Sequence, residues 1–186
     1  MEARPAGKPW RGRVRGHLYS TARVLHDALR PTYPLKVVAR RALRLALSEL
    51  TLTYPDLPAG FDGYRVLHLT DLHLDNIDDT AAAAADTVAR VDADLCVVTG
   101  DIRDNIHSPL RPIMDRLGHI VSAVRAPDGV MGILGNHDSA EMVEPMEELG
   151  LRVLINETVS LARGVDLLHI TGLDDVHRFY TEAAPA

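Results

Sequence analysis

The sequence predicts an α/β fold over residues 50–186, because strand-like and helix-like stretches alternate along this part of the chain. Three short apolar stretches have the composition of buried strands and lie at 65–70, 94–100 and 129–135. Stretches with helical spacing of their apolar residues follow the first two, at 78–91 and 110–124. Strands joined by helices are typical of a parallel sheet. A chain of 186 residues is long enough to bury a sizeable core in one such domain.

Residues 1–49 differ in composition from the rest and are predicted to form a separate basic region. Residues 1–16 are rich in Arg, Gly and Pro, which predicts a disordered arm. Residues 17–29 and 35–50 are predicted amphipathic helices. In the second helix the apolar side chains share one arc. The opposite arc holds the basic side chains Lys36, Arg40, Arg41 and Arg44. Such a helix either lies on an anionic membrane surface or packs its apolar side on its own domain.

The remaining elements are predicted in order from residue 50. Residues 51–54 (TLTY) form a strand, and 55–64 form a turn-rich loop. The helix at 78–91 begins with Asp78 or Asp79 as its N-cap. A helix at 141–150 ends at Gly150 and carries Met142 and Met146 at core spacing. Two strands follow at 152–161 and 165–173, with a turn around Arg163 and Gly164.

Charge is unevenly distributed along the chain, whose formal net charge is −6. Residues 1–44 hold 11 Lys or Arg and 2 Asp or Glu, whereas the other 142 residues hold 9 and 24. An acidic body argues against nucleic acid as a partner, since binding to phosphate backbones needs positive surface. There is no apolar run of transmembrane length and no secretory signal pattern. The single cysteine, Cys96, is predicted to be a core residue, and we expect a cytoplasmic protein.

Polar side chains of a kind that binds metals follow each of the three central predicted strands. Asp71 and His73 follow the first, Asp101 and Asp104 the second, and Asn136, His137 and Asp138 the third. Functional residues in parallel sheets gather at the carboxyl ends of the strands. Any one of these groups alone would be read as a solvated strand end. The three together predict a shared site.

The residue types in this predicted site favour a pair of divalent metal ions. Carboxylate, imidazole and amide oxygen ligands suit Mn, Fe or Zn, and a carboxylate such as Asp101 has enough lone pairs to bridge two ions. Two ions close together generate a hydroxide near neutral pH and hold a phosphate for in-line attack. His137 is a candidate to protonate the leaving oxygen, and Asp104 to orient that histidine. Asp75 and Asp138 are predicted supporting or solvated acids. His68 is predicted to be a core or supporting residue, and His107 and His119 to be surface residues.

Three motifs of the sequence resemble a known family. Asp71-x-His73, then Gly100-Asp101-x-x-Asp104, then Gly135-Asn136-His137-Asp138 resemble the first three motifs of the calcineurin-like metallophosphoesterases. The stretch FDGYRVLHLTDLHLD (61–75) and the stretch GLDD (172–175) are similar to the YkuE-like bacterial branch, some of whose members act on lipid-linked nucleotide sugars. The resemblance covers roughly residues 50–175 and implies a four-layer α/β/β/α sandwich.

The resemblance also implies a role for each matching residue. Asp71 and His73 would bind the first metal, Asp101 would bridge both, and Asn136 would bind the second. Asp104 would pair with His137. The implied activity is that of a metal-dependent phosphoesterase, acting on a phosphate ester or pyrophosphate that is lipid-linked if residues 35–50 contact a membrane. The inner face of the membrane is then a second expected location.

The sequence departs from the family at its C-terminal side. The family's later lone histidine and its Gly-His-x-His motif, which supply three more ligands, do not occur here; His169 and His177 lie in other contexts. The second metal would keep only Asp101 and Asn136. We therefore expect the N-terminal part of a longer enzyme, with the C-terminal strands of the sandwich missing, weak metal binding and little activity. The alternative is an inactive fragment or a non-catalytic binding module, and coding sequence beyond Ala186 would discriminate between the two.

Overall fold

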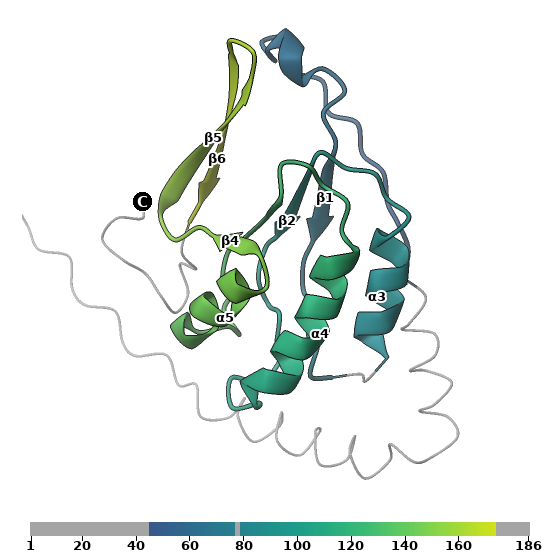
Figure 1. Ribbon diagram of the computed structural model, residues 1–186, viewed down its shortest axis with the longest axis vertical. Coiled ribbons are helices and arrows are strands. Elements are labelled where there is room, and N and C mark those ends of the chain that lie inside the picture. The colour runs from purple at the N-terminus through teal and green to yellow at the C-terminus, as the bar shows by residue number, and fades with distance from the viewer. Residues whose placement is uncertain (1–44, 77–78, 174–186) are drawn as a thin grey trace, which may run out of the picture. The chain divides into compact units, whose positions relative to one another are not determined.

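A parallel sheet of four strands forms the centre of the computed structural model, which describes residues 45–76 and 79–173 (Figure 1). The strands are β1 (Val66–Leu69), β2 (Leu95–Val98), β3 (Val130–Gly132) and β4 (Leu151–Val153). They are hydrogen-bonded in the order β1-β2-β3-β4, and every neighbouring pair is parallel. The carboxyl ends of β1, β2 and β3 therefore lie along one edge of the sheet. The α/β prediction is confirmed.

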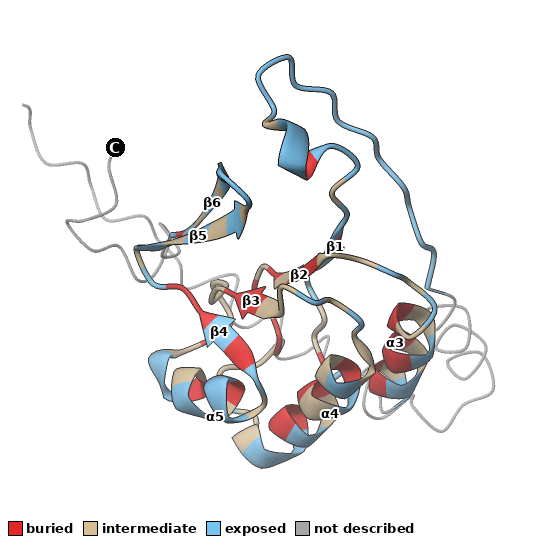
Figure 2. Cartoon of the chain, turned by 45° about the horizontal axis from the view of Figure 1, so that its top comes forward, coloured by how far each residue is buried: buried red, intermediate tan, exposed pale blue. Residues whose placement is uncertain are grey.

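Helices connect consecutive strands and cover one face of this sheet (Figure 2). They are α3 (Thr80–Val88), α4 (Leu110–Ala123) and α5 (Val143–Glu148), the last preceded by the 3-10 turn η2 (Ala140–Met142). Right-handed crossovers that all step in the same direction place their helices on the same face. Met142 and Met146 are fully buried there, as their spacing predicted. Gly150 has φ +92°, the left-handed conformation expected just after a helix.

The second face of the sheet packs against an antiparallel hairpin of β5 (Glu157–Arg163) and β6 (Asp166–Gly172). Successive side chains of a strand point to opposite faces, so Cys96 and Val98 belong to the helix-side core whereas Leu95 and Val97 belong to the hairpin-side core. The described residues thus form three layers: helices, parallel sheet and hairpin.

Arg163 fixes the turn of the hairpin near the amino end of the sheet. Its guanidinium donates two hydrogen bonds to the Asp128 carboxylate, at 3.1 and 2.6 Å, and the Tyr64 hydroxyl donates a third, at 2.6 Å. The same guanidinium lies over the rings of Phe61, in the short 3-10 turn η1 (Ala59–Phe61), and of Tyr64. These contacts hold the hairpin against the loops that precede β1 and β3.

Three predicted elements differ from the structure. The strand predicted at 152–161 is divided between β4 and β5. The chain turns at Asn156 (φ +52°), leaves the parallel sheet after β4, and forms β5, which pairs with β6. Residues 51–54 form no strand, since nothing in the described part of the chain pairs with them, and they are exposed. Residues 45–50, the end of the helix predicted at 35–50, are exposed and not helical. The predictions for residues 1–44, Asp78, Asp174, Asp175 and His177 lie outside the described residues. The boundary at residue 50 stays a prediction.

Candidate metal centre

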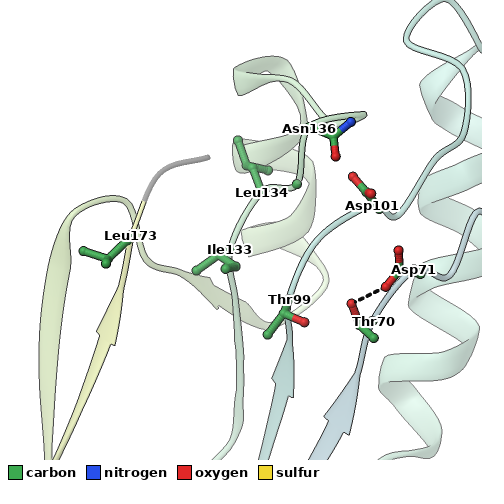
Figure 3. Close-up of a pocket in the computed structure, with 9 residues that line it drawn as sticks. Thr70, Asp71, Thr99, Asp101, Ile133, Leu134, Asn136 and Leu173 are labelled. Atoms are coloured by element: carbon green, nitrogen blue, oxygen red, sulfur yellow. Dashed lines mark hydrogen bonds between the residues drawn. The ribbon is translucent and has the colours of Figure 1, made fainter. Parts of the chain in front are cut away.

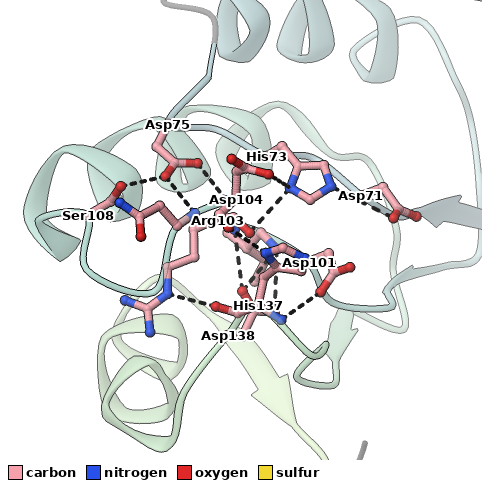
Figure 4. Close-up of polar contacts among 11 residues, drawn as sticks. Asp71, His73, Asp75, Asp101, Arg103, Asp104, Ser108, His137 and Asp138 are labelled. Atoms are coloured by element: carbon pink, nitrogen blue, oxygen red, sulfur yellow. Dashed lines mark hydrogen bonds and ion pairs between the residues drawn. The ribbon is translucent and has the colours of Figure 1, made fainter. Parts of the chain in front are cut away.

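The loops that follow β1, β2 and β3 meet at the carboxyl edge of the sheet and carry the predicted ligands (Figure 4). Backbone hydrogen bonds join the first two loops beyond the end of the strands. The amides of Asp71 and His73 donate to the carbonyls of Gly100 and Asp101, at 3.2 and 3.0 Å. The two loops are thus held side by side at the positions where the candidate ligands emerge.

The backbone at the candidate ligands adopts a conformation that is rare outside glycine. Asp71, His73 and Asp101 have φ of 53°, 41° and 51°. Only one other non-glycine residue in the described part of the chain, Asn156, has a positive φ. A left-handed conformation costs on the order of 1 kcal/mol or more per residue and tends to persist at functional sites. Here it turns three side chains toward one point.

Asp71, His73 and Asp101 each place a ligand atom within 4.8 Å of those of the other two. The Nδ1 atom of His73 lies 3.3 Å from the carbonyl oxygen of Arg103, which leaves Nε2, 3.9 Å from Oδ1 of Asp71, free to face the centre. Metal-binding histidines usually donate their other ring N–H to such an oxygen. Two carboxylates and an imidazole fit a divalent ion of the Mn, Fe or Zn class.

Asn136 lies beside this cluster, on the loop after β3, and Figure 3 shows its side-chain oxygen directed toward the Asp101 carboxylate. Both residues line an open pocket of about 370 Å³ together with Asp71. Thr70 and Thr99 continue the polar side of the pocket. Its apolar side is made by Ile133, Leu134 and Leu173.

His137 and Asp104, the predicted catalytic pair, are in contact at this site. Nδ1 of His137 is hydrogen-bonded to the backbone carbonyl of Asp104 rather than to the carboxylate that we expected. The Asp104 carboxylate lies 3.8 Å from Nδ1 of His73 instead. The amide of His137 donates to Oδ1 of Asp101 at 3.0 Å, and the rings of His137 and His73 meet edge to face at 5.5 Å. The catalytic roles of both residues stay predictions.

Two glycines allow the second and third loops to approach each other. A Cβ atom on Gly100, whose φ is +87°, would lie 2.3 Å from the nitrogen of Gly135. A Cβ on Gly135 would lie equally close to Oδ1 of Asp101. Both distances are far below van der Waals contact. The glycines of the second and third motifs are therefore required by the close approach of the two backbones.

Asp75 ties the first loop to the second. Its carboxylate accepts hydrogen bonds from the amides of Asp104 and Asn105, at 2.6 and 3.1 Å, and from the Ser108 hydroxyl at 2.5 Å. Burial acts to raise the pKa of Asp75, but the hydrogen bonds from Ser108 and the two amides outweigh it and lower that pKa. The sequence predicted a supporting or a solvated acid at position 75. The hydrogen bonds show Asp75 as a supporting acid.

Thr70 and Arg103 shape the site but were not predicted to do so, whereas Asp138 was predicted as a supporting or solvated acid and His68 as a core or supporting residue. Thr70 donates a hydrogen bond to Oδ2 of Asp71 at 2.7 Å. Arg103 and Asp138 are fully buried between the second and third loops. His68 is exposed, so it is not a core residue, and its Nε2 lies 2.7 Å from the Thr99 hydroxyl. An arginine two residues after Asp101 would ordinarily be a solvated charge, and no sequence pattern around Arg103 predicts that it is buried.

A comparison with known families agrees with this geometry. A sequence profile described as calcineurin-like phosphoesterase matches residues 64–184, nearly two thirds of the chain, including all three motifs. The chain belongs to the calcineurin-like phosphoesterase family. The matched range contains the whole parallel sheet of the chain and every candidate ligand.

Three individual proteins are similar to part of this chain. The chain is 32% identical over 144 residues to the uncharacterized metallophosphoesterase YkuE of Bacillus subtilis, covering 69% of this chain and 47% of that protein. It is 29% identical over 120 residues to YkoQ of the same organism, covering 60% and 43%. It is 30% identical over 103 residues to the UDP-2,3-diacylglucosamine pyrophosphatase LpxG of Chlamydia trachomatis, covering 53% and 30%. The chain spans less than half the length of each of these relatives.

Proposed function

We propose that this phosphoesterase uses a pair of divalent metal ions to hydrolyse a phosphate ester or pyrophosphate. The observation that supports it best is the convergence of Asp71, His73 and Asp101 at adjacent strand ends, with ligand atoms within 4.8 Å of one another. Figure 3 shows Asp101 between Asp71 and Asn136, which supports the proposal that Asp101 is shared by the two ions. When bound, such ions supply an activated water and neutralise phosphate oxygens.

The chain's own residues supply orientation and a proton in this proposal. His137 has Nδ1 engaged by the Asp104 carbonyl, so Nε2 is the atom available to substrate. In its protonated form that atom stabilises negative charge on the phosphate and gives a proton to the leaving oxygen. The hydrogen bond from the His137 amide to Asp101 keeps the acid and the bridging carboxylate in fixed relation.

The two metal positions are unequal in this chain. The first has three candidate ligands, whereas the second has Asp101 and Asn136 among the described residues. Two protein ligands hold a transition metal loosely. We therefore propose one tightly held ion per chain, and confine the weak metal binding expected from the sequence to the second position.

Metal binding and hydrolysis together test the proposal. We expect the purified chain to bind one Zn²⁺ or Mn²⁺ tightly and to hydrolyse bis-p-nitrophenyl phosphate slowly, with a requirement for excess Mn²⁺. Asp101→Asn should abolish both properties, His137→Ala only the hydrolysis, and His107→Ala, an exposed histidine, neither. Metal binding without Mn²⁺-dependent hydrolysis would favour the non-catalytic binding module. Fast turnover with stoichiometric Mn²⁺ would contradict the incomplete second position, and absence of metal binding would contradict the whole proposal.

A lipid-linked phosphate or pyrophosphate is the substrate class that we propose for this site. Two observations support it: the similarity to LpxG, whose name states a diacylglucosamine substrate, and the apolar side of the pocket next to the candidate ligands. We expect an isoprenyl diphosphate to compete with bis-p-nitrophenyl phosphate more strongly than inorganic pyrophosphate does. Equal competition by the two compounds would contradict a lipid-linked substrate.

Membrane contact through residues 35–50 stays a prediction, which co-sedimentation with anionic vesicles would test. No helix in the described residues is both long and apolar enough to span a bilayer.

A further inference from the structure

Two charged side chains are fully buried in the described part of the chain. They lie on the two loops that also carry Asp101 and Asn136. Arg103 belongs to the loop after β2, and Asp138 to the loop after β3. Burying a charge is costly unless it is fully hydrogen-bonded. The hydrogen-bond partners of Arg103 and Asp138 therefore indicate which parts of the structure the two side chains stabilise.

Arg103 uses its whole guanidinium on the loop after β3. Nε donates to the carbonyl of His137 at 3.0 Å, and one terminal nitrogen donates to the Ser139 hydroxyl at 2.6 Å. The other terminal nitrogen lies 3.4 Å from the Glu141 carboxylate, whose side chain is 61% exposed. The planar fork of arginine suits three acceptors spaced along one loop, which the single ammonium of lysine does not.

Asp138 makes the reverse connection. Its carboxylate accepts hydrogen bonds from the amides of Ile102 and Arg103, at 3.0 and 3.3 Å, and from the amide of Gly135 at 2.9 Å. Burial raises the pKa of Asp138, against the effect of these amide bonds. Each loop thus sends one buried side chain to the backbone of the other. We call Arg103 and Asp138 the loop clasp.

The side chain of Arg103 bonds to the segment that carries Asn136, whereas only its backbone carbonyl contacts a first-metal ligand, Nδ1 of His73. The bonds of the loop clasp end at Gly135, His137 and Asp138, the immediate neighbours of Asn136. Asp71 and His73 are instead held by backbone bonds to Gly100 and Asp101 and by the bonds of Asp75. In the proposed function, Asp101 is shared by the two metal positions, so it is Asn136, and not Asp71 or His73, that depends on the guanidinium of Arg103.

We propose that Arg103 is a positioning residue for the second metal position, which sets Asn136 opposite Asp101 through the loop clasp. This inference rests on the proposed function, because it takes Asn136 and Asp101 as the ligands there. Loss of the guanidinium removes one half of the loop clasp, while the Asp138 bonds and all four ligands stay in place. Partners that orient ligands in this way typically contribute about 10- to 100-fold to metal affinity.

Zn²⁺ titration of the isotope-labelled chain, followed by NMR, separates the two positions. The His73 imidazole signals report the first position, and the Asn136 side-chain amide signals report the second. Arg103→Met should raise the apparent Kd at Asn136 by about tenfold or more and change that at His73 little. Arg103→Lys should lie between Arg103→Met and the unaltered chain, because it restores the charge without the fork. Arg152→Met, which removes an exposed arginine paired with Glu157, is the matched control and should change neither.

Ser139→Ala and Glu141→Ala remove one partner of Arg103 each and serve if Arg103→Met does not fold. They should weaken binding at Asn136 alone. Equal weakening at His73 and Asn136 would show a general structural role and overturn the inference. So would an unchanged Asn136 titration, or a Zn²⁺ response at His73 without any at Asn136 in the unaltered chain. No response at either residue would instead contradict the proposed function itself.

Discussion

Gly135 and Asp101 approach so closely that a Cβ atom on the glycine would lie 2.3 Å from Oδ1 of the aspartate. The loop after β3 passes directly over the residue that we propose as bridging ligand. We expect Gly135→Ala to cost about 1–3 kcal/mol in the free energy of unfolding, as overpacking does. It should also weaken Zn²⁺ binding, because the methyl group displaces Asp101. Urea unfolding followed by circular dichroism and a Zn²⁺ titration measure the two effects.

Gly132→Ala is the control for that substitution. Gly132 is the last residue of β3, three positions before Gly135, but its added Cβ would meet side-chain atoms no closer than 3.4 Å, an ordinary contact. Its Zn²⁺ affinity should stay unchanged. Equal effects of the two substitutions would show that any added methyl group in this segment is disruptive, and that the approach of Gly135 to Asp101 is not the cause.

Asp75→Ala should lower stability, because two backbone amides and a hydroxyl lose their acceptor. Leaving such groups unsatisfied costs about 1–3 kcal/mol. Asp86→Ala, at an exposed position on α3, should change the free energy of unfolding by less than about 0.5 kcal/mol. Urea unfolding of both variants at neutral pH measures the difference. A change at Asp75 as small as that at Asp86 would mean that the first and second loops are held by their backbone bonds alone.

Thr70→Val should weaken metal binding with little effect on stability. The Thr70 hydroxyl donates to Oδ2 of Asp71, and valine keeps the shape of the side chain but not the donor. Loss of a partner that orients a ligand predicts about a tenfold rise in the Kd for Zn²⁺. Competition with a metal-sensitive dye gives this value, and Thr53→Val, at an exposed position, is the control. An unchanged Kd would show that Asp71 does not depend on this bond.

Tyr64 should ionise only at unusually high pH. Burial is the main cause that raises the pKa of its hydroxyl, and the hydrogen bond to Asp128 adds to it. Because the folded pKa is raised, this contribution to stability is fully present below the ordinary tyrosine pKa of about 10 and is lost as pH rises beyond it. A difference absorbance titration between the unaltered chain and Tyr64→Phe isolates this ionisation. A difference curve with its midpoint at the ordinary value would contradict the contact with Asp128.

The overall sheet could be predicted from the sequence because its signals are local. Apolar runs of strand length and helical apolar spacing each depend on neighbours within a few residues, and they located β1, β2, β3 and the helices between them. The end of β4 could not be found in this way. Residues 152–161 read as one strand, and only the pairing of β5 with β6 decides where the chain leaves the parallel sheet.

For the candidate site, the sequence by itself determined the kinds of ligand and the strand ends on which they lie, because both follow from residue type and order. The tertiary structure alone decided how they converge. The left-handed backbone of Asp71, His73 and Asp101, and the burial of Arg103 and Asp138, depend on contacts between loops about 30 residues apart in the chain. No local pattern encodes such contacts, since each loop takes its conformation from the loop beside it.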